Sequence, residues 1–517
     1  MSDSAVPYFS VINHRGLVPK PAHFEIMDEG ATLSLGTLVP EGEYAAEVLS
    51  ALEVIPLFCI PERETTVNTS TDGSLPAEAY RLEITPDSVQ VVAGDAAGAF
   101  YAVISLLQLA LQYRAEIPLL KVIDQPRYSY RGQMVDVARS FLTVAQIRDI
   151  IDAGAAHKLN ILHLHIIDDQ GWRIEITNEG REDGDDTDYT ALHRIGSTTA
   201  CQSGEDPGFD KPEEALGVVV DYHNDFSGVA QGHTGYYTQA EFLELRDYAR
   251  RRHIEIIPEV EFPGHNHVVM HALPQLATAG ASVQAQVNEV GESTVPAWTS
   301  WQVGHSYLDF NNEATWAFAR HLFRQMYRLV GDTPLHLGGD EAMHMIVKLG
   351  MEGYLKAMNR VLQIARETGF SQVILWEEGA LMDLGPSDTV QFWTTQYGEE
   401  LLEKLNQRVL ETGCSLINSN AHHAYLDQKL SLDDPRGLTW ACPEGLPTET
   451  SYNWNPDEDF PPAVQAHLQG VEAPLWGETV RGLDDAFYLM YPRLAAIAEV
   501  AWTPQADRDW EDFSARL

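Results

Sequence analysis

The residues best suited to chemistry are two consecutive acids, Asp340 and Glu341, in the stretch PLHLGGDEAM (334–343). They follow an apolar, strand-like run and two glycines. A carboxylate at the carboxyl end of a strand is typical of an active site in a parallel α/β barrel. A solvated turn is the alternative interpretation, and the surrounding sequence distinguishes the two.

Other strand-like runs also end in polar or aromatic side chains, namely Asp168 and Asp169 (HLHIIDDQGW), Glu261 and His265 (PEVEFPGH), Trp376 (LWEE), Trp393 (QFWTT), Tyr425 and Asp427 (HAYLD), and Trp476 and Glu478 (APLWGE). Each one alone could cap a helix or fill a rim. Clustered carboxylates, however, are costly to bury unless they are used. Indole rings stack on the apolar face of a pyranose, and carboxylates accept hydrogen bonds from its hydroxyls, so the pattern predicts a sugar site.

Within this set, Glu341 is the candidate general acid, because nearby acids and a desolvated pocket would raise its pKa towards neutrality. Retaining glycosidases place their two carboxylates ~5 Å apart across the scissile bond, and inverting enzymes place them further apart. Adjacent residues of a strand point to opposite faces. Asp340 is therefore poorly placed as a partner nucleophile, and we expect it to hold a group of the substrate.

These side chains sit in a chain that alternates strands and helices from about residue 130. Thr143 with Gln146, and Thr238 with Glu241, have capping-box spacing and predict two helix starts. The further elements expected are strands 161–167 and 253–262, helix 313–330, strand 335–339, helix 351–369, strands 372–378, 389–395 and 414–418, and a helix near 484–499. This alternation predicts a parallel sheet, and the number of units favours a (β/α)8 TIM-type barrel of the α/β class.

The barrel is expected over residues 126–517, with long loops at 177–237, 266–306 and 420–470. Residues 1–125 are expected to form a small α+β domain, with a hairpin over 79–95 and its turn at Pro-Asp-Ser. The uncharged segment 96–113 is about long enough to span a bilayer. Three polar residues inside it favour a buried helix of a globular domain instead.

Composition narrows the functional classes. The 34 Lys and Arg against 76 Asp and Glu give a net charge of −42, which argues against nucleic acid or an anionic membrane as partner. The four cysteines are far apart and fit neither a zinc site nor a disulfide scaffold. The Asp-rich run 182–188 lacks calcium-loop spacing. No signal peptide is visible, so we expect a cytoplasmic protein, although a trimmed secreted protein would look the same.

The ordered motifs resemble those of glycoside hydrolase family 20, the β-N-acetylhexosaminidases. They cover most of the chain and are, in order, YRLEITPDSVQVVAGDAAGAFYAVISLLQL, RGQMVDVARSF, HKLNILHLHIIDDQGWRIEI, PEVEFPGH, HLGGDEA, LWEE, YLD, LWGE and YPRLAAIAEVAW. The resemblance implies an N-terminal α+β domain before the barrel. It also implies an exo-acting, retaining enzyme that removes terminal β-GlcNAc or β-GalNAc from an amino-sugar oligosaccharide or glycoconjugate.

The resemblance also assigns the site. Glu341 becomes the general acid/base, and Asp340 orients the 2-acetamido group, whose carbonyl oxygen attacks C1 to give an oxazolinium intermediate. Tyr425 is expected to bind that carbonyl, and His265 to support Glu341 through a relay. Sugar contacts are expected from Arg139, Asp168, Trp376, Trp393, Asp427, Trp476 and Glu478. No metal or cofactor is implied. Where the family usually has Asp, this chain has Glu261, which is expected to reach the imidazole of His265.

Three alternatives stay open. His163 and His165 alternate on one strand, so a metal-dependent amidohydrolase-type barrel could use them with His265 and Asp340. A non-catalytic sugar-binding protein would keep the Trp walls but would not need Glu341. A family relative could instead release a disaccharide or 6-sulfo-GlcNAc. The sequence does not decide between GlcNAc and GalNAc, the linkage or the oligomeric state, although a homodimer would fit the family.

Overall fold

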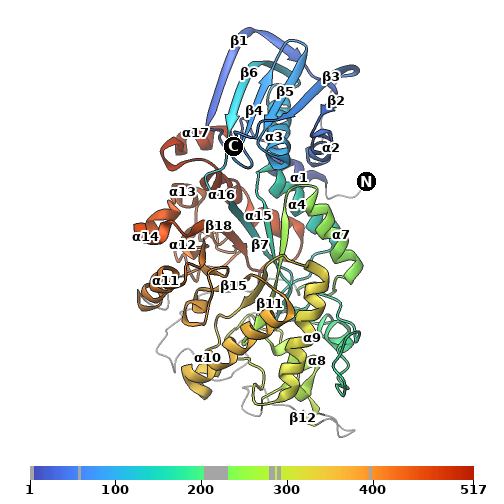
Figure 1. Cartoon of the computed structure of the whole chain (residues 1–517), viewed down its shortest axis with the longest axis vertical. Coiled ribbons are helices and arrows are strands. Elements are labelled where there is room, and N and C mark those ends of the chain that lie inside the picture. The colour runs from blue at the N-terminus through green and yellow to red at the C-terminus, as the bar shows by residue number, and fades with distance from the viewer. Residues whose placement is uncertain (1–4, 56–59, 203–230, 279–285, 288–292, 395–398) are drawn as a thin grey trace.

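The computed structural model has two parts, a small domain and a larger barrel, and describes residues 5–55, 60–202, 231–278, 286–287, 293–394 and 399–517 (Figure 1). Parts of the expected loops 177–237 and 266–306 therefore lie outside the described residues, as does Cys59. Among the described residues, no helix is long and apolar enough to cross a membrane.

The N-terminal domain is one mixed sheet with two helices on it (Figure 1). Its strand order is β1-β6-β4-β5-β3-β2. The strands are β1 (His23–Ser34), β2 (Gly36–Gly42), β3 (Ile60–Thr71), β4 (Tyr80–Ile84), β5 (Ser88–Ala93) and β6 (Glu116–Asp124), and the helices are α2 (Ala45–Val54) and α3 (Ala96–Gln112). Strands β4 and β5 form the predicted hairpin. Helix α3 is the uncharged segment, and almost all of it is buried, in contact with both the N-terminal sheet and the barrel.

The predicted (β/α)8 barrel is confirmed, because eight parallel strands close on one another. They are β7 (Tyr130–Asp136), β8 (Ile161–His165), β11 (Glu255–Phe262), β14 (Leu335–Gly338), β15 (Val373–Trp376), β16 (Thr389–Phe392), β17 (Ser415–Asn418) and β18 (Leu468–Leu475). Strand β7 was not among the strands predicted from periodicity. All seven of its residues are buried and several are polar, so it shows no apolar alternation.

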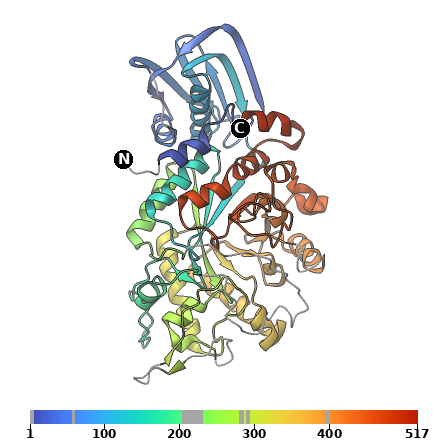
Figure 2. The same cartoon turned by 180° about the vertical axis from the view of Figure 1, so that it is seen from behind.

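The outer layer consists mainly of the helices that follow the strands (Figure 2). They are α4 (Val144–Ala156), α7 (Gln239–Arg250), α9 (Glu313–Val330), α10 (Met343–Thr368), α11 (Glu399–Thr412), α15 (Leu483–Met490) and α16 (Arg493–Trp502). Both predicted capping boxes are present, at Thr143–Gln146 and Thr238–Glu241. After β15 only the 3₁₀ turn η2 (Glu377–Leu381) precedes β16.

Two predicted helices differ from those observed. The helix expected near 484–499 is divided into α15 and α16 around Pro492, which cannot continue a helix because its ring clashes with the preceding turn. Helix α10 begins before the predicted 351–369 and contains a kink at Gly350, where φ is 72°.

Short elements occupy the loops and the chain ends. They are α1 (Ala5–Ile12), β9 (Ile167–Asp168), β10 (Gly171–Trp172), α5 (Thr190–Gly196), α8 (His267–Ala272), η1 (Pro274–Leu276), β12 (Gln286–Val287), β13 (Ser293–Thr294), α12 (Ala421–Ala424), α13 (Thr448–Asn453), η3 (Pro456–Asp459), α14 (Pro462–Gln465), η4 (Gln505–Asp507) and α17 (Trp510–Arg516). Helix α1 packs against α4 and α15 of the barrel, and the hydroxyl of its Tyr8 donates to Val54 O of α2.

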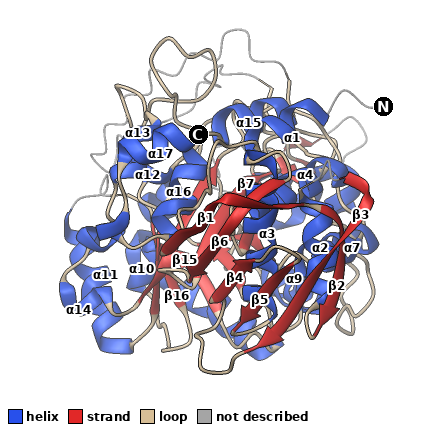
Figure 3. Cartoon of the chain, turned by 90° about the horizontal axis from the view of Figure 1, so that it is seen from above, coloured by secondary structure: helices blue, strands red, loops and turns tan. Residues whose placement is uncertain are grey.

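The N-terminal sheet lies over one end of the barrel in the view of Figure 3, and two ion pairs identify that end as the amino end of the strands. Lys158 Nζ, just before β8, lies 2.9 Å from Asp124 Oδ2 at the end of β6, and both side chains are buried. Arg131 of β7 lies 2.7 Å from Glu78. These buried pairs tie the domain to the barrel and leave the opposite, carboxyl end of the strands free for a site.

Candidate active site

A pocket opens at the carboxyl ends of the barrel strands and contains most of the predicted residues. The space between its lining atoms is about 760 Å³, counting the open space at its mouth. Of the eleven residues predicted for the site, ten line it: Arg139, Asp168, His265, Asp340, Glu341, Trp376, Trp393, Tyr425, Trp476 and Glu478. Only Asp427 of the predicted set is not a lining residue.

Asp340 and Glu341 face the same side of the pocket. Their carboxylates lie 3.8 and 3.6 Å from one atom, His265 Nε2. The prediction that strand geometry would turn them to opposite faces is wrong, because β14 ends at Gly338 and the next residues do not continue it. Gly338, Gly339 and Glu341 all have positive φ, of 67°, 105° and 47°. This turn lets two consecutive acids share one imidazole.

Gly338 is required at that turn for a second reason. A Cβ built on it would lie 2.0 Å from Glu261 Oε2. Because only glycine combines a positive φ with so close an approach, a larger residue would displace either the turn that carries Asp340 and Glu341 or the side chain of Glu261. The hydroxyl of Tyr354 holds the next peptide by donating to Gly339 O at 2.5 Å.

His265 is held from the other side by Asp168, whose Oδ1 lies 3.2 Å from His265 Nδ1. Burial alone would lower the pKa of His265, but the carboxylates of Asp168, Asp340 and Asp169 raise it well above its ordinary value. The imidazole is therefore a buried cation placed between Asp168 on one side and Asp340 and Glu341 on the other. It fixes the position of both acids and offsets their negative charge.

Glu261 does not make the contact predicted for it. The Nδ1 atom of His265 faces Asp168, whereas the Glu261 carboxylate lies under Gly338 and 3.7 Å from His165 Nδ1. The space left by the missing side chain of Gly338 accepts the longer Glu side chain. Burial and the nearby Glu259 carboxylate raise the pKa of Glu261 well above its usual range. We infer that Glu261 is an uncharged acid of the pocket floor.

Asp168 and Arg139 form a buried pair on the neighbouring wall. Arg139 Nη1 lies 2.9 Å from Asp168 Oδ2 and 3.2 Å from Asp136 Oδ2. His165 Nε2 also lies 2.8 Å from Asp168 Oδ2. Asp168 was predicted to bind a sugar hydroxyl, but its oxygens are already occupied by Arg139, His165 and His265. Its contacts favour a role in holding Arg139 and His265.

Glu478 is better placed to accept a hydroxyl. It lines the pocket, and its Oε2 atom makes no hydrogen bond to any other residue that the structure describes. Burial raises the pKa of Glu478, although Arg139 opposes the shift. The Arg139 guanidinium lies over the Trp476 ring at 5.2 Å from its centroid, so a donor, an acceptor and an aromatic face adjoin one another.

Asp427 lies outside the pocket lining and is completely buried. Its Oδ2 atom accepts hydrogen bonds from Trp440 Nε1 at 3.2 Å and from Gln428 Nε2 at 2.8 Å. Burial and the charge of Glu478 raise its pKa to about 7. The prediction that Asp427 lies in the pocket is therefore corrected, because Asp427 supports the wall residue Trp440.

Aromatic rings form most of the wall, and sequence reasoning found only part of them. Besides the predicted Trp376, Trp393, Tyr425 and Trp476, the wall includes Trp301 and Trp440, together with the apolar Val303 and Leu438. The ring of Trp440 lies 5.5 Å from Tyr425 and 5.9 Å from Trp393. Trp301 and Trp440 come from loops 266–306 and 420–470. Each loop also holds a second Trp, Trp298 or Trp454, so residue type in these aperiodic segments does not single out the wall residue.

The metal-site alternative does not match the arrangement of its histidines. His163 and His165 point into the barrel, where His163 Nδ1 lies 2.8 Å from Glu472 Oε1 and His165 Nδ1 contacts Glu259 Oε2. In the described part of the chain, the group His265–Asp340–Glu341 in the pocket is close enough to hold an ion, but it includes neither His163 nor His165; the group His163–Glu259–His336 lies deeper in the barrel. Both His163 and His336, however, are sealed beneath the pocket, whereas a catalytic metal needs a position open to substrate.

The fold and the pocket define a class of protein: a barrel enzyme with a carboxylic acid pair, a buried imidazole and an aromatic sugar wall. Sequence comparison gives the family. The catalytic-domain model of glycosyl hydrolase family 20 matches residues 128–505, and its domain 2 model matches residues 15–125. The chain belongs to glycoside hydrolase family 20, and it is a glycoside hydrolase with β-hexosaminidase activity.

Individual relatives agree with this assignment. A β-N-acetylhexosaminidase of Cellulomonas fimi is 30% identical over 97% of this chain and 92% of its own length. A β-hexosaminidase of Akkermansia muciniphila is 28% identical over 88% of this chain and 86% of its own. The solved Streptomyces plicatus N-acetyl-β-hexosaminidase in complex with Thio-NAglucal is 29% identical, with a TM-score of 0.77 over 98% of this chain and 93% of that one.

Proposed function

We propose that this hydrolase is an exo-acting, retaining β-N-acetylhexosaminidase that removes terminal β-GlcNAc or β-GalNAc with the substrate's own acetamido group as nucleophile. The observation that carries the proposal is the shared contact of Asp340 and Glu341 with His265 Nε2. Two carboxylates on one side of one imidazole cannot flank a glycosidic bond from opposite sides, as an acid and an enzyme nucleophile must.

The reaction follows from the positions of these groups. Glu341 donates its proton to the glycosidic oxygen as the bond to C1 breaks. The Oδ1 atom of Asp340 is buried without a hydrogen-bond partner among the described residues, so it can accept from the acetamido N–H and turn the carbonyl oxygen towards C1. That oxygen forms the new bond to C1, and the anionic Asp340 stabilises the positive charge of the oxazolinium ring.

The second half returns Glu341 to its starting state. Glu341 takes a proton from water, whose oxygen attacks C1 and opens the ring, so two inversions give net retention. Burial raises the pKa of Tyr425 well above its usual value, which keeps its hydroxyl protonated as a donor to the acetamido oxygen. Trp376, Trp393 and Trp476 provide the wall against which the sugar ring and the acetyl methyl pack.

Two further features support a single amino sugar as the group released. The loop residues Trp301 and Trp440 add walls to the pocket, which favours a closed subsite over an open groove. Among the lining residues that the structure describes, Arg139 is the one Arg or Lys, and it is paired with Asp168 and Asp136. A sulfated sugar would need a cation free to bind the sulfate, so the pocket favours an unsulfated one.

The test is hydrolysis of p-nitrophenyl β-GlcNAc and β-GalNAc by the wild type, Glu341→Gln and Asp340→Asn. The matched control is Glu403→Gln, the same change of residue type at an exposed position of α11 that does not line the pocket. We expect turnover of at least one sugar by the wild type and the control, and loss in both catalytic variants. A folded wild type that releases neither sugar, but cleaves a disaccharide glycoside or 6-sulfo-GlcNAc, would contradict the proposal.

A further inference from the structure

The interior of the barrel beneath the pocket is unusually polar. One layer is apolar apart from a tyrosine hydroxyl and comes from four alternate strands: Tyr130, Ile257, Ile374 and Ile417. The other four strands contribute the buried polar residues His163, His336, Gln391 and Glu472. In barrels of this kind, bulky branched aliphatic residues usually fill these layers. A polar layer costs desolvation energy that an aliphatic layer would avoid.

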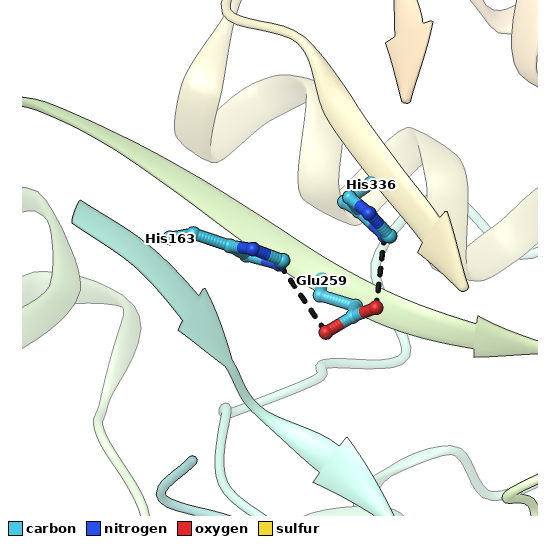
Figure 4. A group of neighbouring side chains, drawn as sticks. All are labelled: His163, Glu259 and His336. Carbon is cyan, nitrogen blue, oxygen red and sulfur yellow. Dashed lines mark ion pairs between the residues drawn. The ribbon is translucent and has the colours of Figure 1, made fainter. Parts of the chain in front are cut away.

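Glu259 of β11 links this polar layer to the pocket. Figure 4 shows its carboxylate between the imidazoles of His163 on β8 and His336 on β14. Glu259 Oε2 lies 3.2 Å from His163 Nε2, and Oε1 lies 2.8 Å from His336 Nδ1. Burial alone would raise the pKa of Glu259, but these imidazoles and that of His165 lower it well below its ordinary value, so the carboxylate is charged.

The first connection from Glu259 to the pocket goes through Trp376. The indole Nε1–H of Trp376 donates to Glu259 Oε1 at 2.7 Å. The Trp376 side chain is almost fully buried, and its ring lies 5.9 Å from the ring of Trp476. Since an indole has one donor, this hydrogen bond fixes the rotation of the ring that forms the aromatic wall.

The second connection goes through His165. Its Nδ1 atom contacts Glu259 Oε2, and its Nε2 atom lies 2.8 Å from Asp168 Oδ2. Asp168 in turn contacts both Arg139 and His265. One carboxylate therefore reaches the sugar-binding wall in one contact. Through His165 it reaches, in two contacts, Asp168, which holds both the Arg139 guanidinium and the His265 imidazole.

We propose that Glu259 is a positioning residue. It fixes the Trp376 ring relative to the Asp168–His265 pair, so that a sugar bound against this ring lies in reach of Asp340 and Glu341. This inference rests on the proposed function. Glu259 touches neither substrate nor reacting atoms, and it acts through Trp376 and His165. A purely structural role would require only that the charge be paired somewhere in the core.

Glu472 of β18 provides the matched control. It is equally buried, and its oxygens contact His163 at 2.8 Å, Tyr130 at 2.5 Å and Gln391 at 2.7 Å. None of these three residues lines the pocket. Replacing Glu472 by Gln therefore removes a buried carboxylate from the same polar core without disturbing a contact to a pocket residue.

The experiment compares Glu259→Gln with Glu472→Gln in steady-state hydrolysis of p-nitrophenyl β-GlcNAc, with the folded fraction measured by circular dichroism. We expect Glu259→Gln to lower kcat/KM by about 10- to 100-fold, comparable to losses when residues that orient metal ligands are replaced. The loss should include a raised KM, because the Trp376 wall binds the ground state. Glu472→Gln should keep KM near the wild-type value even if its melting temperature falls.

Each outcome decides the matter. Equal losses of kcat/KM in the two variants would overturn the inference. So would a loss of activity in Glu259→Gln that is fully explained by a smaller folded fraction, with KM unchanged. If Glu259→Gln does not fold, Glu259→Asp keeps the charge but is too short to reach Trp376, and an unchanged KM in that variant would overturn it. An inactive wild type would overturn the proposed function and this inference with it, whereas an active wild type tests the inference separately.

Discussion

Asp340 and Glu341, which are consecutive in the chain, present their carboxylates to the same atom, His265 Nε2, at 3.8 and 3.6 Å. In the proposed reaction this relationship gives the two acids different roles. One acid can exchange a proton with the glycosidic oxygen, while its neighbour holds a group on the same face of the sugar. The arrangement needs the left-handed turn at Gly338 and Gly339 and a charged imidazole to offset two acids.

The two acids should respond differently to the leaving group. Glu341→Gln removes the proton donor, so we expect a loss of about 10²- to 10⁴-fold for a poor leaving group and a much smaller loss for 2,4-dinitrophenol, which departs without a proton. Asp340→Asn should lose about 10²- to 10³-fold for both, because it weakens stabilisation of the ring charge. Rate constants for a series of aryl β-GlcNAc substrates check this. An equal leaving-group dependence in the two variants would be evidence against the assigned roles.

The pH profile should have an acid limb set by Asp340. Burial raises its pKa to about 6. Asp340 must be ionised to accept from the acetamido N–H and to stabilise the oxazolinium charge. The value of kcat/KM should therefore fall as the pH drops through about 6 and reach its full value above that pH. The limb should disappear from the residual activity of Asp340→Asn. A wild-type profile that stays flat down to pH 4 would contradict this prediction.

The wall residue Trp440 should contribute to sugar binding. Its ring adjoins Tyr425 and Trp393. Replacing it by Ala removes aromatic contacts of about 0.5–1.5 kcal/mol each, so KM should rise roughly 2- to 10-fold with a smaller change in kcat. Trp440→Phe, which keeps an aromatic face, should lie closer to the wild type. An unchanged KM in Trp440→Ala would exclude contact between this ring and the substrate.

Metal removal should leave the activity unchanged. The imidazoles of His163 and His165 are already paired with Glu472 and Glu259, and the proposed reaction uses protons and the substrate's carbonyl oxygen. We expect the same kcat before and after dialysis against a chelator, and no gain on adding divalent ions. Loss of activity that zinc restores would favour the metal-dependent alternative.

The N-terminal domain should stabilise the barrel through the buried pair of Lys158 and Asp124. Lys158→Met removes the positive partner of the buried Asp124 carboxylate, which keeps only its hydrogen bonds from Tyr80 and Trp502. Breaking such a buried pair costs about 3–5 kcal/mol of folding free energy. The melting temperature should therefore fall clearly while kcat of the folded enzyme is kept. A substitution of the exposed Lys404, paired with Glu400 on α11, is the control and should change the melting temperature little. Equal melting temperatures for Lys158→Met and the wild type would contradict this role.

Sequence reasoning predicted the elements whose signals are local. The capping boxes at Thr143 and Thr238 predict helix starts because their hydrogen bonds lie within four residues. Strand β7 was missed because its buried positions hold the polar residues Arg131, Gln133 and Asp136, which give no apolar signal. Periodicity cannot detect a strand that is buried on both faces and carries polar residues on each.

The site followed the same pattern: its residues were predicted from local signals, whereas their contacts with residues distant in sequence were not. The strand-like runs and the family resemblance together identified ten lining residues, but the contacts between them depend on three-dimensional details. The position of Glu261 is set by the space at Gly338, which lies 77 residues away in sequence. The orientation of Glu341 is set by its positive φ, and that of Asp427 by Trp440 from a long loop. None of these follows from residue type and spacing.

The central claim is that the substrate's acetamido oxygen is the nucleophile, and its nucleophilicity can be varied without touching the protein. The measurement is kcat/KM for p-nitrophenyl β-GlcNAc and its mono-, di- and trifluoroacetyl analogues, with the wild type at a pH above the acid limb. Fluorine withdraws electrons from the carbonyl oxygen, so the account predicts a steep, progressive fall along the series. Rates that stay nearly constant would contradict it and indicate a nucleophile supplied by the enzyme or by water.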